Sequence, residues 1–168
     1  MLDKLFPEQY VEGINECESF NYDENPIVIT QFLGTGIQYI PKTSYSLTRL
    51  QIVLVFGELP QDASIEFNLQ SDYGDEPSDI VLRSANFVPV EVGAGWKEIK
   101  CEPVSLVKGR KYWLAIHPKG CPTVITQAVK GDNIPISFKA LNRWKKSPDV
   151  AKGKIMLRFF GRIFPVSN

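Results

Sequence analysis

The stretch from Ser64 to Gln70 reads SIEFNLQ and alternates polar and apolar residues without a break. Successive side chains of a β-strand point to opposite faces, so Ile65, Phe67 and Leu69 would share one face and the polar residues the other. The pattern predicts a strand whose apolar face is buried and whose polar face is in solvent. Such strands are the units of a β-sandwich.

Strand-like runs bounded by glycine, proline and polar turns lie on both sides of this stretch. They cover residues 27–32, 36–40, 46–56, 80–87, 96–101, 103–107, 111–117, 124–129, 134–141 and 154–164. No long segment repeats apolar residues with the helical period. About ten short strands without a long helix predict an all-β fold, a sandwich of two antiparallel sheets.

The N-terminal segment has a different pattern. Tyr10, Ile14 and Cys17 recur at helical spacing, so a short helix and an ordered arm both agree with it. We therefore divide the chain into an N-terminal arm, residues 1–25, and a sandwich domain, residues 26–168.

The arm is acidic, yet it carries more apolar residues than a disordered tail usually has. We expect it to dock on a neighbouring subunit or another partner, and the same contact within one chain is the alternative. The basic segment from Arg143 to Lys154 is a complementary target, because opposite charges set the register of an interface.

The two halves of the chain carry opposite charge. Residues 1–82 hold 14 acidic and three basic residues, whereas residues 83–168 hold 16 basic and five acidic ones. The halves either form a dipolar particle that stacks head to tail, or interleave in the sandwich and neutralise each other, as Greek-key strands do. The formal net charge is zero, so no nucleic-acid partner is indicated.

The first residues, MLDKLFPE, lack the basic and apolar regions of a secretory signal. If Met1 is the natural start, we expect synthesis in the cytoplasm without a signal peptide. No apolar run approaches the roughly 20 residues of a membrane span, and no membrane partner is expected.

Three cysteines, Cys17, Cys101 and Cys121, do not make a disulfide framework. Cys101 alternates with Lys100 in an expected strand and is predicted to face the core as a small apolar residue. A Cys101–Cys121 disulfide is the alternative.

Several motifs recur in order between Ser46 and Arg162. They are Leu47 to Leu54 (LTRLQIVL), Glu66 to Ser78 (EFNLQSDYGDEPS), Val81 to Ala85 (VLRSA), Gly95-Trp96, Leu106 to Ile116 (LVKGRKYWLAI), and a final strand from Met156 to Gly161. This pattern resembles a family of jelly-roll domains found in bacterial and archaeal surface proteins with assorted membrane anchors and in virion proteins of phages.

The resemblance implies a jelly-roll topology and a role without catalysis. It implies a structural protein of a phage or archaeal virus, a capsid decoration or tail-associated protein on the virion surface, with virion proteins or further copies of itself as partners. A carbohydrate-binding module of a surface or secreted protein is the alternative, because some family members resemble such modules.

The chemistry-bearing residues are too sparse for an active site. His117 is the only histidine, so a nucleophile–histidine–acid site would need it. The G-x-S-x-G, P-loop and dinucleotide-binding motifs are absent from the sequence. We predict no catalytic residues and place His117 at the surface end of a strand.

The turn after residue 71 is acidic, with Asp72, Asp75 and Glu76 close together in sequence. Clustered carboxylates suit Ca²⁺, which prefers hard oxygen ligands. A solvated acidic turn without metal is the alternative, and no other cofactor is expected.

Aromatic residues are the best binding candidates. We expect Trp113 in the core and Trp96 near a sheet edge or under a loop. Trp144 lies between Arg143 and Lys145, and with Tyr73 these residues are predicted to contact a ligand or partner, since exposed aromatic rings anchor sugars and proteins. The alternative is that Trp144 folds back onto the sandwich while the cations point outward.

Overall fold

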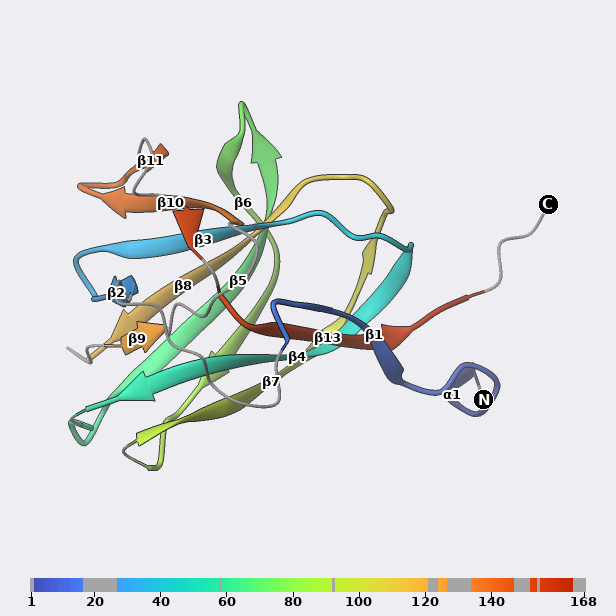
Figure 1. Cartoon of the computed structure of the whole chain (residues 1–168), viewed down its shortest axis with the longest axis horizontal. Coiled ribbons are helices and arrows are strands. Elements are labelled where there is room, and N and C mark those ends of the chain that lie inside the picture. Colours follow the sequence, from blue (N-terminus) through green and yellow to red (C-terminus); the bar gives the residue numbers. More distant parts are fainter. Residues whose placement is uncertain are drawn as a thin grey trace.

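The computed structural model describes residues 2–16, 27–57, 59–91, 93–120, 124–126, 134–146, 152–153 and 155–164. Of the described residues, 70% lie in strands and 2% in helix. Its strands form two antiparallel sheets (Figure 1). The predicted all-β sandwich is therefore confirmed at the level of two packed sheets.

The first sheet is centred on a long strand, β4, and has β1 at one edge. Its members are β1 (Gln9–Ile14), β13 (Leu157–Arg162), β4 (Tyr45–Phe56) and β7 (Gly93–Leu106), with the short β9 (Val124–Thr126) and β2 (Ile27–Ile29) continuing it beside the end of β4. β13 and β9 pair with successive parts of β4, and β7 pairs with β4 as well.

The second sheet runs from β11 at one edge to β6 at the other. Its order is β11 (Arg143–Lys146), β10 (Ile134–Ala140), β3 (Gly34–Tyr39), β8 (Tyr112–Lys119), β5 (Ser64–Tyr73) and β6 (Glu76–Phe87), and β12 (Lys152–Gly153) also pairs with β10. In Figure 1 the hairpin of β5 and β6 extends past the neighbouring strands.

The core lies between the two sheets and follows the expected period of two. Ile65, Phe67 and Leu69 of β5 are all buried in it, as the sequence predicts. The ring of Phe159, on β13 of the first sheet, stacks on the ring of Tyr39, on β3 of the second, with 3.8 Å between the ring centroids. Burial of these side chains is the main stabilising contribution to the sandwich.

The N-terminal segment is mostly a strand. A four-residue helix, α1 (Leu2–Leu5), precedes β1, which pairs antiparallel with β13. The segment around Tyr10 and Ile14 is thus a strand and not the short helix that was one of the two possibilities, because pairing with β13 outweighs local propensity. β1 belongs to the sandwich, so the proposed boundary after residue 25 does not separate arm from sheet, whereas Cys17 lies outside the described residues.

Three glutamates hold β1 in place. Glu8 accepts a hydrogen bond from Thr48 (2.5 Å), Glu12 accepts one from the Tyr39 hydroxyl (2.6 Å), and Glu16 pairs with Arg158. The contact forms within one chain, and the cation that pairs with Glu16 comes from β13 rather than from the predicted basic segment after Arg143.

The oppositely charged halves interleave. Ion pairs join acids of the first half to bases of the second half: Glu16–Arg158, Glu66–Lys119, Asp75–Lys111 and Asp79–Lys139. These pairs cross between strands distant in sequence, so the charge halves neutralise each other locally, which agrees with the interleaved alternative.

Removing the Glu12 carboxylate should loosen β1. Glu12 also accepts a hydrogen bond from the backbone N–H of Lys42 (3.2 Å). We expect Glu12→Ala to lower the free energy of unfolding by about 1–2 kcal/mol, because the buried Tyr39 hydroxyl loses a charged acceptor. Denaturant unfolding measures this loss. The exposed Glu91, replaced by alanine, is the control, and equal stabilities of the two variants would contradict the role of Glu12.

Candidate functional site

The predicted contact residues around Trp144 are split between two faces of β11. Trp144 is buried, with 8% of its surface exposed, and its Nε1 donates a hydrogen bond to Asp79 (2.8 Å). Arg143 and Lys145 are exposed and point to the opposite face, because neighbouring residues of a strand alternate. The ring thus lies folded onto the sandwich, as in the alternative interpretation, and is not an exposed platform.

Tyr73 lies on a different element. It sits at the tip of the β5–β6 hairpin, where 79% of its surface is exposed. The next residues, Gly74 and Asp75, both have positive φ angles, which makes the turn tight. Tyr73 is the predicted contact aromatic that the structure leaves accessible.

The acidic turn at the tip of the β5–β6 hairpin bonds to side chains on or next to two other strands of the second sheet, β3 and β8. Asp72 accepts a hydrogen bond from the Trp113 Nε1 (2.7 Å), and Asp75 accepts bonds from Gln38 (2.9 Å) and Lys111 (3.1 Å). Among the described residues, no three Asp, Glu, His or Cys side chains gather as a metal site. Asp72, Asp75 and Glu76 do not form such a group in this structure, and binding of Ca²⁺ at this turn stays a prediction.

Trp113 is fully buried, as predicted, but it lies on the outer face of the second sheet rather than between the two sheets. It lies on the face of β8 opposite Leu114, which belongs to the inter-sheet core. The β5–β6 hairpin covers this outer face through Asp72. Trp96 is half-buried on β7, where Arg158 stacks on its ring at 3.9 Å, in agreement with the expected position near a sheet edge.

A row of polar side chains lies buried under the same hairpin. Asn68 donates to Glu66 (2.9 Å), Gln70 donates to Asn68 (2.8 Å), and the backbone N–H of Asp79 donates to Gln70 (2.9 Å). The sequence predicted the correct face for these residues but placed it in solvent. Each amide in the row finds a partner, so its burial carries a small penalty.

Beside this row, the outer face of the second sheet is hollowed. The hollow has a volume of about 480 Å³ and is lined by Gln31, Phe32, Gly34, His117, Lys139, Ala140, Leu141 and Asn142. Its residues come from the turn before β3, the end of β8 and the β10–β11 turn. His117 is conspicuous in the sequence as the only histidine, but its neighbours in the hollow were not predicted because they are distant along the chain.

His117 forms part of the hollow and is half-buried. Its ring centroid lies 5.9 Å from that of Trp144. Burial and the nearby Lys139 hold the pKa of His117 below its usual value, so the imidazole is neutral at pH 7. A Cβ at Gly34 would lie 2.7 Å from the imidazole Nδ1, so this glycine makes room for the ring.

The charges at this hollow are paired. Lys139 forms an ion pair with Asp79 at 2.8 Å. Burial opposes the charge of Asp79, but hydrogen bonds from Lys139 and Trp144 keep the pKa of its carboxyl below the usual value. The cation and the anion therefore compensate each other beside a neutral imidazole.

The turn at the rim of the hollow has an unusual residue. Leu141 and Asn142 form the two-residue turn between β10 and β11, with φ angles of 51° and 62°. Two positive φ angles are typical of a type I′ turn, which favours asparagine and glycine. Leu141 is nevertheless present and 97% exposed.

Replacing this leucine should stabilise the protein. We expect Leu141→Asn to raise the free energy of unfolding by about 1 kcal/mol, because asparagine adopts the left-handed conformation at lower cost than leucine. Chemical denaturation compares the variant with the parent. Unchanged or reduced stability would mean that the exposed Leu141 side chain contributes packing that the structure does not show.

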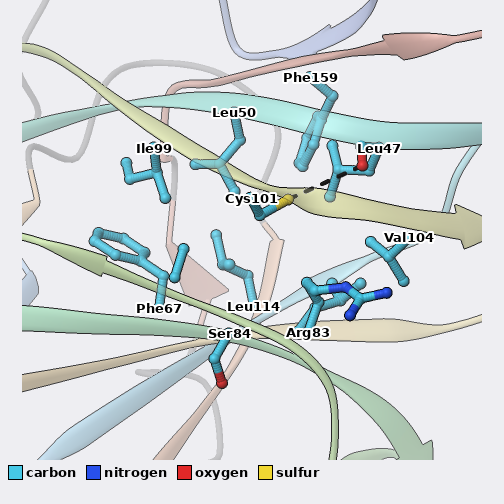
Figure 2. Close-up of a pocket in the computed structure, with 12 residues that line it drawn as sticks. Leu47, Leu50, Phe67, Arg83, Ser84, Ile99, Cys101, Val104, Leu114 and Phe159 are labelled. Carbon is cyan, nitrogen blue, oxygen red and sulfur yellow. Dashed lines mark hydrogen bonds between the residues drawn. The ribbon is translucent and has the colours of Figure 1, made fainter.

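A second cavity lies inside the sandwich (Figure 2). It measures about 20 Å³ and is lined mostly by aliphatic and aromatic side chains of both sheets, such as Leu50, Phe67, Ile99 and Phe159. This volume holds about one water molecule, which needs polar partners that the lining barely offers. We interpret it as a packing void of the core rather than a ligand site.

Cys101 projects into this void, as Figure 2 shows. Burial raises the pKa of its thiol, which makes it a weak nucleophile at neutral pH. Cys101 is a free thiol, and Cys121 lies outside the described residues. The position agrees with the prediction of a small apolar core residue.

No protein-family model matches the sequence, and no curated protein matches it. Among the described residues, no helix combines the length and hydropathy needed to cross a bilayer. Inferences about function therefore rest on the fold and on the surfaces described above.

Proposed function

We propose that the sandwich is a jelly roll. In that topology eight consecutive strands form one sheet in the order 1-8-3-6 and a second in the order 2-7-4-5. With β1, β3, β4, β5, β6, β7, β8 and β13 numbered one to eight, the pairings β1-β13-β4-β7 and β3-β8-β5-β6 follow both orders. On this assignment β9 and β2 are additions to the first sheet, and β10, β11 and β12 are additions beside β3 in the second.

The protein acts, in this proposal, as a non-enzymatic structural protein that assembles with protein partners. The resemblance to virion jelly rolls points to a capsid decoration or tail-associated role on the virion surface. The observation that supports assembly is a run of exposed apolar residues within an edge strand, β6. Ile80, Val81 and Leu82 are 63%, 48% and 36% exposed on β6, and Val90 in the following loop is 85% exposed.

The position of these residues strengthens the inference. β6 ends the order of the second sheet, so part of its backbone faces away from β5. Soluble proteins usually protect such edges with charged residues or proline, because unpaired apolar strands recruit other chains. An apolar patch left at an edge is typical of a protein interface. A second copy of the chain is the simplest occupant.

Positive charges introduced by substitution on β6 should abolish assembly. We expect the wild-type protein to self-associate in sedimentation velocity over a series of micromolar concentrations, and the double variant Ile80→Lys/Leu82→Lys to be monomeric. A buried cation without a partner would oppose the interface. The control is Val107→Lys, at a residue with 42% exposure outside β6. A wild-type monomer, or a double variant that still associates, would contradict assembly through β6.

A carbohydrate-binding module remains the second candidate. The hollow beside His117 favours it, because a concave site with mixed polar and apolar lining is typical of small-molecule binding. Trp144, which the sequence offered as an exposed ring for a sugar, is buried and does not present its face to a ligand. Binding of immobilised glycans by the purified protein tests this candidate independently of assembly.

A further inference from the structure

We propose that the hollow beside His117 binds one neutral sugar ring, stacked on Phe32. The inference rests on the second candidate function above and adds to it the site, the residues and the charge of the ligand. It does not depend on assembly through β6, because no residue that lines the hollow belongs to β6.

The volume of the hollow suits a ligand of this size. Small-molecule sites occupy roughly 300–1,000 Å³, and the hollow measures about 480 Å³. Its residues belong to a hydrogen-bonded sheet and to two short turns. A ligand would therefore meet an arrangement that is already formed, which lowers the entropic cost of binding.

Phe32 supplies an apolar platform held by its turn. The ring is 79% exposed, although the backbone around it is well ordered by hydrogen bonds. Thr30 and Leu33 exchange backbone hydrogen bonds of 3.4 and 3.1 Å, and the Thr30 hydroxyl accepts a bond from the Phe32 N–H (3.2 Å). An exposed aromatic ring on a fixed turn matches the C–H face of a pyranose.

Leu141 provides a second apolar contact at the same hollow. It is almost fully exposed and occupies a backbone conformation that favours asparagine or glycine. Exposed apolar side chains in strained conformations gather at binding sites, where the strain supports a contact. Phe32 and Leu141 thus offer apolar surface from two separate turns to the same ligand.

The polar lining suits hydroxyl groups. Neutral imidazole has one donor and one acceptor nitrogen, and the amides of Asn142 and Gln31 carry both kinds of atom. A sugar hydroxyl donates one hydrogen bond and accepts others, so it pairs with such groups. Because the pKa of His117 is lowered, its imidazole keeps one donor and one acceptor nitrogen at neutral pH.

Charge compensation favours a neutral ligand over an anion. Lys139 is paired with Asp79, so an acidic ligand would compete with an existing partner and meet a carboxylate nearby. Exposed cations such as Arg143 point to the other face of β11. The site therefore selects hexopyranoses or their N-acetyl derivatives rather than uronic acids or sugar phosphates.

Saturation-transfer NMR with glucose, galactose, mannose, N-acetylglucosamine and glucuronic acid, followed by a glycan array, tests the proposal. We expect at least one neutral sugar to bind, and Phe32→Ala to weaken its affinity at least tenfold. Leu141→Asn, which should be more stable than the parent, is expected to weaken binding as well, so loss of fold cannot explain the loss. Leu5→Ala removes a similarly exposed apolar residue elsewhere, 70% exposed, and should leave the affinity unchanged.

Three outcomes would overturn the proposal. They are the absence of binding to every sugar and array glycan, a preference for glucuronic acid over the neutral sugars, and equal losses in the Phe32 and Leu5 variants. The assembly variant Ile80→Lys/Leu82→Lys should bind sugar normally. Failure of assembly and failure of sugar binding are therefore distinguished by separate variants and measurements.

Discussion

Trp113→Ala should lower the free energy of unfolding by about 3–5 kcal/mol, as truncations of large buried side chains do. The indole has no exposed surface and lies between β8 and the β5–β6 hairpin. Its loss leaves a cavity under the hairpin and removes the hydrogen bond from Nε1 to Asp72. We therefore expect the hairpin to lose its attachment to the sheet together with the packing.

Denaturant unfolding, monitored by far-UV circular dichroism, measures this loss. Trp96→Ala is the matched control, because Trp96 is a half-buried tryptophan at the edge of the other sheet and should cost clearly less. Trp113→Phe retains most of the packing but not the hydrogen bond, so it separates the two contributions. A loss below about 1 kcal/mol for Trp113→Ala would show that the hairpin does not cover the ring.

Gly161→Ala should be similarly damaging, with an expected loss of about 3 kcal/mol or more from overpacking. Gly161 lies in β13, which is paired on both sides, with β1 and with β4. A Cβ built there would lie 2.1 Å from the Ser46 carbonyl oxygen and 2.7 Å from the Tyr45 ring. Backbone atoms cannot yield as a flexible side chain does, so the pairing of β13 with β4 must shift.

Gly95→Ala provides the control for this substitution. Gly95 also lies in a strand, β7, but a Cβ there would meet nothing within 4 Å. We expect this variant to be neutral or slightly stabilised, because alanine restricts the unfolded chain more than glycine does. Equal stabilities of the two alanine variants in thermal unfolding would contradict the close approach of β13 to β4.

Strand positions were predictable because they depend on local periodicity. The alternation from Ser64 to Gln70 placed Ile65, Phe67 and Leu69 on the inner face, and the structure confirms it. The N-terminal segment shows where this reasoning fails. Tyr10 and Ile14 fit a helical period, yet hydrogen bonds to β13 make the segment a strand.

The candidate site was harder to predict than the strands, because the alternation of side chains along a strand separates residues that are neighbours in sequence. Trp144 and its flanking cations appeared to form one surface, but alternation along β11 points them in opposite directions. The hollow instead joins Phe32, His117 and Leu141, which no sequence spacing links. Phe32 was assigned to a strand, whereas the described strand β2 ends at Ile29.

The sequence by itself determined the all-β class, the positions of most strands and the apolar face that each turns to the core. These properties follow from the side-chain period of the strand and from turn residues, which act over a few positions. Tertiary structure alone decided the strand order and which polar face is covered. The turn of the β5–β6 hairpin covers Trp113 because Asp72 and Asp79 bond to Trp113 and Trp144, more than 40 positions away, and no local pattern records contacts of that range.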